Sequence, residues 1–178
     1  MSGFYGQGFF LDRDGTINED RGYVYRIEDF IFLPGAIEAI DIINRHGYLA
    51  VVVTNQSGIA RGYYTRRDVD YLHCYINQCL SLAGARIDAF YLCPHLPGVQ
   101  CGCRKPRPGM LLRAAGELDI ILGHSFMVGD KMSDIEAGMA AGCKAVLIND
   151  SRQGRLGSSG IKCAGSLLEA VHYCLKLN

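Results

Sequence analysis

The sequence predicts an α/β fold: a Rossmannoid three-layer sandwich in which helices cover both faces of a mostly parallel central sheet. Strand and helix signals alternate along the chain, which favours parallel strands joined by right-handed crossovers. The run Leu-Ala-Val-Val-Val at 49–53 is apolar throughout, as expected for a strand buried on both faces. Polar residues follow directly after several strand signals, so the carboxyl edge of the sheet is the expected ligand site.

Length and composition narrow the class of protein. The 178 residues, 49% of them hydrophobic and 20% charged, fit a single domain over 1–178, and no internal repeat is visible. With 18 basic and 18 acidic residues the formal net charge is zero, which argues against general nucleic-acid binding. No stretch reaches the roughly 20 apolar residues of a membrane span, and the N-terminal region does not resemble a signal peptide. We expect a cytoplasmic monomer without membrane or nucleic-acid partners, whose eight cysteines are mostly reduced or metal-bound.

The first part of the chain begins with an apolar strand at 8–11, which leads into Asp12 and Asp14. If the strand continues through both aspartates, their side chains emerge on one face. The polar segment 17–24 indicates a loop. The next segment, 34–47, predicts a helix: it starts with a Pro-Gly pair, carries isoleucines at helical spacing and ends in a glycine that can stop the helix. That helix begins too soon for an inserted domain.

The remaining elements follow the same alternation. The segment Thr-Arg-Arg-Asp at 65–68 resembles a capping box, although Asp replaces the usual Glu or Gln, and it opens a helix to about residue 80. The other predicted elements are strands at 87–92, 125–128 and 145–148, helices at 108–118 and through 140, a Gly/Ser-rich loop, and a final helix from about 166.

Three predicted strands end in polar residues with chemical potential: Asp12 and Asp14, then Thr54 and Asn55, then Asp130 after Gly129. A single such ending is usually a solvated turn. Three endings at the same edge of one parallel sheet form a site. Two carboxylates as close as Asp12 and Asp14 repel each other, and the simplest compensation is a divalent cation.

A loop at 93–103 contains a second set of metal ligands. Cys93, His95, Cys101 and Cys103 follow the pattern C-x-H-x5-C-x-C, and a Cys₃His set binds structural zinc. The alternative is a group of unrelated or redox-active thiols. Because four protein ligands leave no open position, a catalytic zinc is not expected. Zn²⁺ would instead fold the loop and fix the residues that follow it, Arg104 and Lys105.

Two segments resemble motifs of the haloacid dehalogenase (HAD) superfamily. Residues 9–16, F-F-L-D-R-D-G-T, resemble motif I, D-x-D-G-[TV], and 129–134, G-D-K-M-S-D, resemble motif IV, G-D-x-x-x-D. The resemblance implies a HAD-like fold and a phosphatase in which Asp12 is the nucleophile and Asp14 the general acid and base. It makes Thr54 the motif II hydroxyl and Lys105 the motif III lysine. The implied Mg²⁺ ligands are Asp12, the main-chain carbonyl of Asp14, and Asp130, whereas Asp134 either touches the metal shell or binds Lys131 or the N-terminus of its helix.

Within the superfamily, the zinc loop and the Arg-Lys-Pro at 104–106 resemble a capless group that contains D,D-heptose 1,7-bisphosphate phosphatases and histidinol-phosphate phosphatase domains. Segments 22–24, 54–62 and 104–110 are more similar to the heptose enzymes, and the resemblance spans most of 8–148. The short spacing inside the zinc loop is more similar to the histidinol-phosphate group.

The resemblance implies removal of the 7-phosphate of D-glycero-D-manno-heptose 1,7-bisphosphate through an aspartyl-phosphate, on the route to ADP-heptose for the lipopolysaccharide core. The alternatives are a histidinol-phosphate phosphatase of histidine biosynthesis and a catalytically dead, zinc-organised binding module. By the same analogy, the residues that contact this small phosphorylated sugar are Asp20, Arg21, Gly22, Tyr23, Thr54, Asn55, Gln56, Ser57, Arg104, Lys105 and Lys131.

Overall fold

The computed structural model describes residues 6–149 and 161–177, which contain a six-stranded sheet with the order β3-β2-β1-β4-β5-β6. All neighbouring strands are parallel, which confirms the predicted α/β sheet. The strands are β1 (Gly8–Leu11), β2 (Leu49–Asn55), β3 (Ala89–Cys93), β4 (Phe126–Gly129), β5 (Lys144–Ile148) and β6 (Lys162–Ala164).

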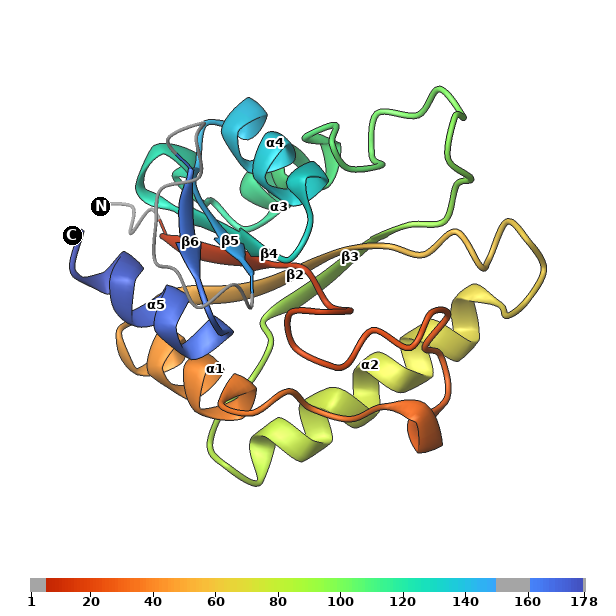
Figure 1. Ribbon diagram of the computed structural model, residues 1–178, viewed down its shortest axis with the longest axis horizontal. Coiled ribbons are helices and arrows are strands. Elements are labelled where there is room, and N and C mark those ends of the chain that lie inside the picture. The colour runs from red at the N-terminus through yellow and green to blue at the C-terminus, as the bar shows by residue number, and fades with distance from the viewer. Residues whose placement is uncertain (1–5, 150–160, 178) are drawn as a thin grey trace.

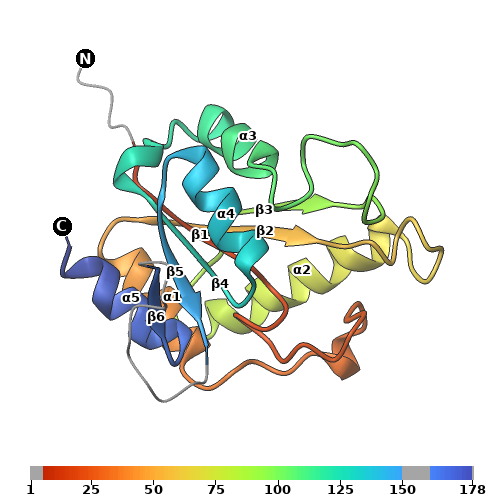
Figure 2. The same ribbon diagram turned by 45° about the horizontal axis from the view of Figure 1, so that its top comes forward.

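Helices cover both faces of the sheet, as the three-layer prediction requires (Figures 1 and 2). One face packs against α1 (Ala36–Arg45), α2 (Arg66–Ser81) and α5 (Leu167–Leu175), and the other against α3 (Gly109–Glu117) and α4 (Met132–Ala141). Alternate residues of β1 serve the two layers: Phe9 and Leu11 pack in the first core, and Phe10 packs in the second. Two 3₁₀ turns, η1 (Ile27–Asp29) and η2 (Leu122–His124), lie in the connections.

The predicted capping box begins α2. The Thr65 side chain accepts a hydrogen bond from the Asp68 N–H, and the Asp68 carboxylate accepts one from the Thr65 N–H at 2.7 Å. Asp68 therefore performs the reciprocal part that Glu or Gln usually performs, and two unpaired N–H groups of the first turn are satisfied.

The predicted end of β1 agrees with the structure, whereas the bounds of β2 and β3 differ from the predicted ones. β1 ends at Leu11, so Asp12 and Asp14 lie in the turn beyond the strand, where Gly15 has a φ of +87°. β2 extends through Thr54 and Asn55, and β3 begins only at Ala89. The turn after β1 closes because the Arg13 carbonyl accepts hydrogen bonds from the N–H groups of Thr16, Ile17 and Asn18.

The sixth strand was not predicted. β6 is three residues long, Lys-Cys-Ala, and carries no apolar run that marks it in the sequence. Its pairing with β5 makes it a strand, so tertiary context overrides a weak local preference. The predicted Gly/Ser-rich loop before it lies largely outside the described residues.

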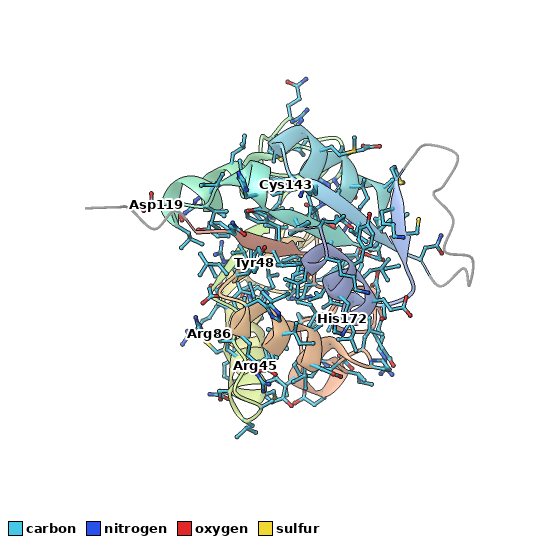
Figure 3. All side chains as sticks on the ribbon, turned by 90° about the vertical axis from the view of Figure 1, so that its left-hand side faces the viewer. Arg45, Tyr48, Arg86, Asp119, Cys143 and His172 are labelled. Carbon is cyan, nitrogen blue, oxygen red and sulfur yellow. The ribbon has the colours of Figure 1, made fainter. Side chains whose placement is uncertain are left out.

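The strand order places the site. The chain passes from β1 to β2 and β3 on one side and then returns to β4 on the other side of β1, so the order reverses between β1 and β4. Among the described residues, the long connection from β1 to α1 contains only η1, and no inserted domain covers this edge. Figure 3 shows the opposite end of the strands, where Tyr48 precedes β2 and Cys143 precedes β5. None of the described helices meets the length and apolarity of a membrane span.

Candidate active site

A cavity of about 410 Å³ lies beyond the carboxyl ends of β1 and β2, beside the N-terminal end of α4. Ten of the eleven residues that the sequence predicts to contact substrate line it, and Arg21 does not. Arg21 instead forms an exposed ion pair with Glu19, with 2.9 Å between Nε and Oε2. The cavity is lined by Asp12, Asp14, Asp20, Gly22, Tyr23, Thr54, Asn55, Gln56, Ser57, Tyr64, Arg104, Lys105, Lys131, Ser133 and Asp134.

Lys105 is a fixed cation at the bottom of the site. Its Nζ lies 2.8 Å from Asp12 Oδ1 and 2.7 Å from Asp134 Oδ1, and it donates to the Val53 carbonyl at 2.7 Å. Burial alone would lower the pKa of Lys105, but the carboxylates of Asp12 and Asp134 raise it above its usual value. The ammonium group therefore stays charged and holds one oxygen of Asp12.

The end of β2 holds the backbone of Lys105. The Asn55 side chain donates to the Lys105 carbonyl and accepts from the Lys105 N–H, both at 3.2 Å. Sequence reasoning assigned Asn55 to substrate, and the paired amide contact to a residue 50 positions away was not foreseen. This contact aligns the lysine with the strand end that delivers Thr54.

The carboxylates of Asp12 and Asp130 fit a divalent cation. Ligand oxygens of Asp12, Asp130 and Asp134 all lie within 4.8 Å of one another. Asp130 Oδ1 is buried and has no hydrogen-bond partner among the described residues. Burial and the nearby charge of Asp12 raise the pKa of Asp130 to about 6. An unpaired buried carboxylate oxygen beside a second carboxylate is a typical position for a bound Mg²⁺.

Two further contacts define this acidic group. Asp134 accepts the Lys131 N–H at 3.0 Å and pairs with Lys105, so its carboxylate already has two partners. A Cβ at position 15 would lie 2.3 Å from Asp130 Oδ2. Gly15 is therefore required for the close approach of Asp130 to the turn after β1.

Asp14 is held from three sides. Arg13 Nη2 lies 2.9 Å from Asp14 Oδ2, Asn18 Nδ2 donates to Oδ1 at 2.9 Å, and Gln56 Nε2 donates to Oδ2 at 2.9 Å. Sequence reasoning named neither Arg13 nor Asn18 as part of the site. A charged residue and a polar residue beside an acidic turn are usually solvated, so no local signal distinguishes them.

Gln56 connects Asp14 to Thr54 and Tyr64. Its Nε2 donates to Thr54 Oγ1 at 2.9 Å, and its Oε1 accepts from the Tyr64 hydroxyl at 2.7 Å. Burial, together with the negative charge of Asp14, raises the pKa of Tyr64 to about 12, so this hydroxyl remains a donor. The Tyr64 ring occupies the space of a side chain at Gly58, where a Cβ would lie 2.2 Å from it.

Charged and aromatic side chains meet at the mouth of the cavity. Lys131 Nζ lies 3.0 Å from Asp20 Oδ2. Burial raises the pKa of Asp20, but the contacts with Lys131 and Gly22 outweigh it and lower the pKa below the usual value. The half-exposed rings of Tyr23 and Tyr63 meet edge to face, with 4.8 Å between centroids.

The four residues of the cysteine loop converge on one point. The ligand atoms of Cys93, His95, Cys101 and Cys103 all lie within 4.8 Å of one another. Cys93 Sγ is 3.2 Å from Cys103 Sγ, 3.8 Å from Cys101 Sγ and 3.4 Å from His95 Nδ1. Arg104 donates to the His95 carbonyl at 3.1 Å, so the loop is tied to the residue next to Lys105. The set could hold one tetrahedral metal ion.

Comparison with known proteins agrees with this geometry. Residues 102–157 match the model of the HAD-hydrolase-like family, and the fold and site define a HAD-like hydrolase. A curated D-glycero-beta-D-manno-heptose-1,7-bisphosphate 7-phosphatase of Pasteurella multocida is 44% identical over 172 residues, which cover 93% of this chain and 92% of that relative. The D-glycero-alpha-D-manno-heptose-1,7-bisphosphate 7-phosphatase of Burkholderia mallei is 46% identical and covers 80% of this chain and 79% of its own length. The chain belongs to the heptose-1,7-bisphosphate 7-phosphatase family.

A solved structure supports the same assignment. The crystal structure of D,D-heptose 1,7-bisphosphate phosphatase from B. bronchiseptica, complexed with magnesium and phosphate, has a TM-score of 0.86 and 33% identity. The match covers 97% of this chain and 99% of that chain. The predicted HAD-like fold is therefore confirmed.

Proposed function

We propose that this protein is a Mg²⁺-dependent phosphatase that removes the 7-phosphate of D-glycero-D-manno-heptose 1,7-bisphosphate. The observation that carries the proposal is one cavity that collects Asp12, Asp14 and the buried cation Lys105, in a chain 44% identical over 93% of its length to an enzyme of that name. The reaction would serve ADP-heptose synthesis for the lipopolysaccharide core. We expect residues 1–178 to act as one domain and as a monomer in the cytoplasm. The relatives named above do not favour the histidinol-phosphate alternative.

In this proposal Asp12 attacks the phosphorus and forms an aspartyl-phosphate. Lys105 orients the Asp12 carboxylate by holding Oδ1 at 2.8 Å. Thr54 Oγ1 accepts from Gln56, which leaves its own proton free to donate to a phosphoryl oxygen. Mg²⁺ held by Asp12, the main-chain carbonyl of Asp14, and Asp130 would supply the positive charge that offsets repulsion between carboxylate and phosphate.

Asp14 performs the proton transfers. It gives a proton to the leaving oxygen of the sugar as the bond from that oxygen to phosphorus breaks. As a carboxylate it then accepts a proton from the water that hydrolyses the aspartyl-phosphate. At the mouth, Arg104 and Lys131 line the cavity and supply cations for a second phosphate.

The loop at 93–103 holds Zn²⁺ in this proposal. In a tetrahedral site with Zn–S bonds of about 2.3 Å, two sulfurs lie about 3.8 Å apart. The observed separation of 3.8 Å between Cys93 Sγ and Cys101 Sγ matches this value, whereas the 3.2 Å between Cys93 Sγ and Cys103 Sγ is shorter. Four protein ligands would leave no position for substrate, so the ion would be structural and would help to hold Arg104 and Lys105 at the cavity.

The decisive experiment measures phosphate release with Mg²⁺ from both anomers of the heptose bisphosphate, histidinol phosphate and 4-nitrophenyl phosphate. We expect kcat/KM to favour one heptose anomer over histidinol phosphate by at least about 10²-fold, which corresponds to about 2.7 kcal/mol of differential transition-state binding. A preference for histidinol phosphate would contradict the proposal. No turnover of any of the four compounds would favour the binding module.

A further inference from the structure

The side chain between the two site aspartates is a fully buried arginine. Arg13 is 0% exposed, although it follows Asp12 directly and precedes Asp14. Its Nε lies 3.1 Å from Asp14 Oδ1 and its Nη2 lies 2.9 Å from Asp14 Oδ2, so the guanidinium contacts both carboxylate oxygens. Nη2 also donates to the Val24 carbonyl. A buried cation is costly unless its hydrogen bonds are satisfied, and an apolar side chain would fill this space with less penalty.

The remaining end of the guanidinium faces a histidine from another element. Arg13 Nη1 lies 3.4 Å from Nε2 of His73, a residue on α2 that is 4% exposed. The imidazole stacks flat on the Phe90 ring of β3, with 4.2 Å between centroids and 14° between planes. Burial and the positive charges of Arg13 and Arg66 lower the pKa of His73 to about 3. A neutral imidazole with Nε2 unprotonated accepts a hydrogen bond from Arg13.

We propose that His73 and Arg13 are positioning residues that fix the Asp14 carboxylate for proton transfer to the leaving oxygen, an inference that rests on the proposed acid–base function of Asp14. His73 sets the plane of the guanidinium, and the guanidinium sets the plane of the carboxylate. When Asp14 releases its proton, Arg13 stabilises the negative charge that appears on it. Because effective proton transfer depends on geometry, a small displacement of Asp14 slows the step.

The test uses two substitutions at His73 with a matched control. His73→Leu removes the acceptor and keeps an apolar side chain against Phe90, and His73→Gln restores an acceptor. Ile76→Val, at a fully buried core position on the same helix, controls for a general loss of stability in α2. Arg13→Lys keeps the charge and removes the planar fork. Asp14→Asn provides the reference for loss of the acid.

The readout compares two leaving groups. The sugar oxygen of the heptose bisphosphate is a poor leaving group and needs a proton, and 4-nitrophenolate leaves without one. The ratio kcat/KM includes only steps up to departure of the leaving group, so the later hydrolysis of the aspartyl-phosphate does not affect it. A variant that misplaces only the acid therefore loses activity on the sugar substrate and not on the aryl phosphate.

We expect Asp14→Asn to lower kcat/KM for the sugar substrate by about 10²- to 10⁴-fold and for the aryl phosphate by less than about threefold. His73→Leu should show the same pattern, with kcat/KM for the sugar substrate lowered about tenfold. In His73→Gln this kcat/KM should lie within about twofold of the value of the parent protein. Ile76→Val should change kcat/KM for the two substrates equally and by less than about twofold.

The outcomes separate the two levels of inference. If Asp14→Asn slows both substrates equally, Asp14 is not the acid and the positioning assignment is wrong as well. If Asp14→Asn discriminates between them but His73→Leu slows both equally or neither, the positioning assignment is wrong and the proposed function stands. Failure of His73→Gln to restore activity also overturns it. The His73 pair decides the question even if Arg13→Lys does not fold.

Discussion

At the scale of single residues, the carboxylates of the site differ in the groups that they contact. Lys105 holds one oxygen of Asp12 and one of Asp134, and both oxygens of Asp14 accept hydrogen bonds from side chains. Asp130 Oδ1 is the buried carboxylate oxygen of the site that has no such partner among the described residues. Nearly identical carboxyl groups therefore have different electrostatic surroundings.

The first prediction concerns the proposed nucleophile. Asp12→Asn should abolish turnover, because an amide cannot form the aspartyl-phosphate, and it should leave a folded protein. Phosphate release measures turnover, and circular dichroism with a denaturant titration measures folding. Substantial remaining turnover in a folded variant would exclude Asp12 as the nucleophile.

The second prediction separates a metal ligand from an anchor of the lysine. Asp130→Asn should raise the Mg²⁺ concentration for half-maximal activity by more than about tenfold, because it removes a charged ligand. Asp134→Asn should change that concentration by less than about threefold and instead lower kcat by about 10-fold or more, since Lys105 loses one of its anchors. A Mg²⁺ titration of both variants checks this. Equal shifts in Mg²⁺ requirement would place Asp134 in the metal shell.

At the scale of elements, the cavity lies between the ends of β1 and β2, the start of α4, and the two residues that follow the loop at 93–103, Arg104 and Lys105. This loop has few apolar contacts of its own: Cys93 is buried, and segment 97–100 is largely exposed. The Cys/His set and the hydrogen bond from Arg104 to the His95 carbonyl are among the contacts that hold this loop. A metal ion there would connect the folding of a loop to the position of Lys105.

The third prediction concerns removal of that metal. Chelation followed by restoration of Mg²⁺ alone should speed amide hydrogen exchange over 93–105 and lower activity, because Arg104 and Lys105 lose their support. Cys101→Ser should reproduce the effect. Cys74→Ser, at an exposed thiol outside the set, is the control and should behave like the parent protein. Full activity in a zinc-free preparation would show that the loop does not position Lys105.

At the scale of the whole molecule, two apolar layers enclose the sheet, and a hydrogen-bonded pair of polar side chains, His73 and Arg13, is buried between these elements. The buried His73 and Arg13 connect α2, β3 and the turn after β1. The pKa of His73 is lowered from 6.5 to about 3 by burial and by neighbouring arginines. The unfolded chain therefore binds a proton below about pH 6.5 that the folded protein does not bind.

The fourth prediction follows from this difference. Because the pKa of His73 is lowered in the folded protein, its contribution to stability is fully present above about pH 6.5 and is lost as the pH falls toward about 3. When the pH falls from about 7.5 to about 5, protonation of His73 in the unfolded chain should lower the free energy of unfolding by about 2 kcal/mol. The His73→Gln variant should not show this loss. Urea titrations of both proteins at the two pH values measure it. Parallel pH profiles would mean that His73 titrates normally in the folded protein.

The sequence by itself determined the α/β sandwich, the capping box of α2, and the group of strand-end residues that includes Asp12, Thr54 and Asp130. These follow from local periodicity and from one topological rule, that parallel strands end at a common edge. The Cys/His set was also visible, because all four ligands lie within one short segment.

Only the tertiary structure decided which partners these residues have. Arg13 meets His73 across 60 positions, and Lys105 meets Asp12 across 93. The amide of Asn55 holds the Lys105 backbone, and β6 exists through its pairing with β5. Sequence periodicity carries information over a few residues, whereas these contacts depend on how distant segments pack. A buried arginine in an acidic turn has the same sequence signal as a solvated one, so burial alone distinguished it.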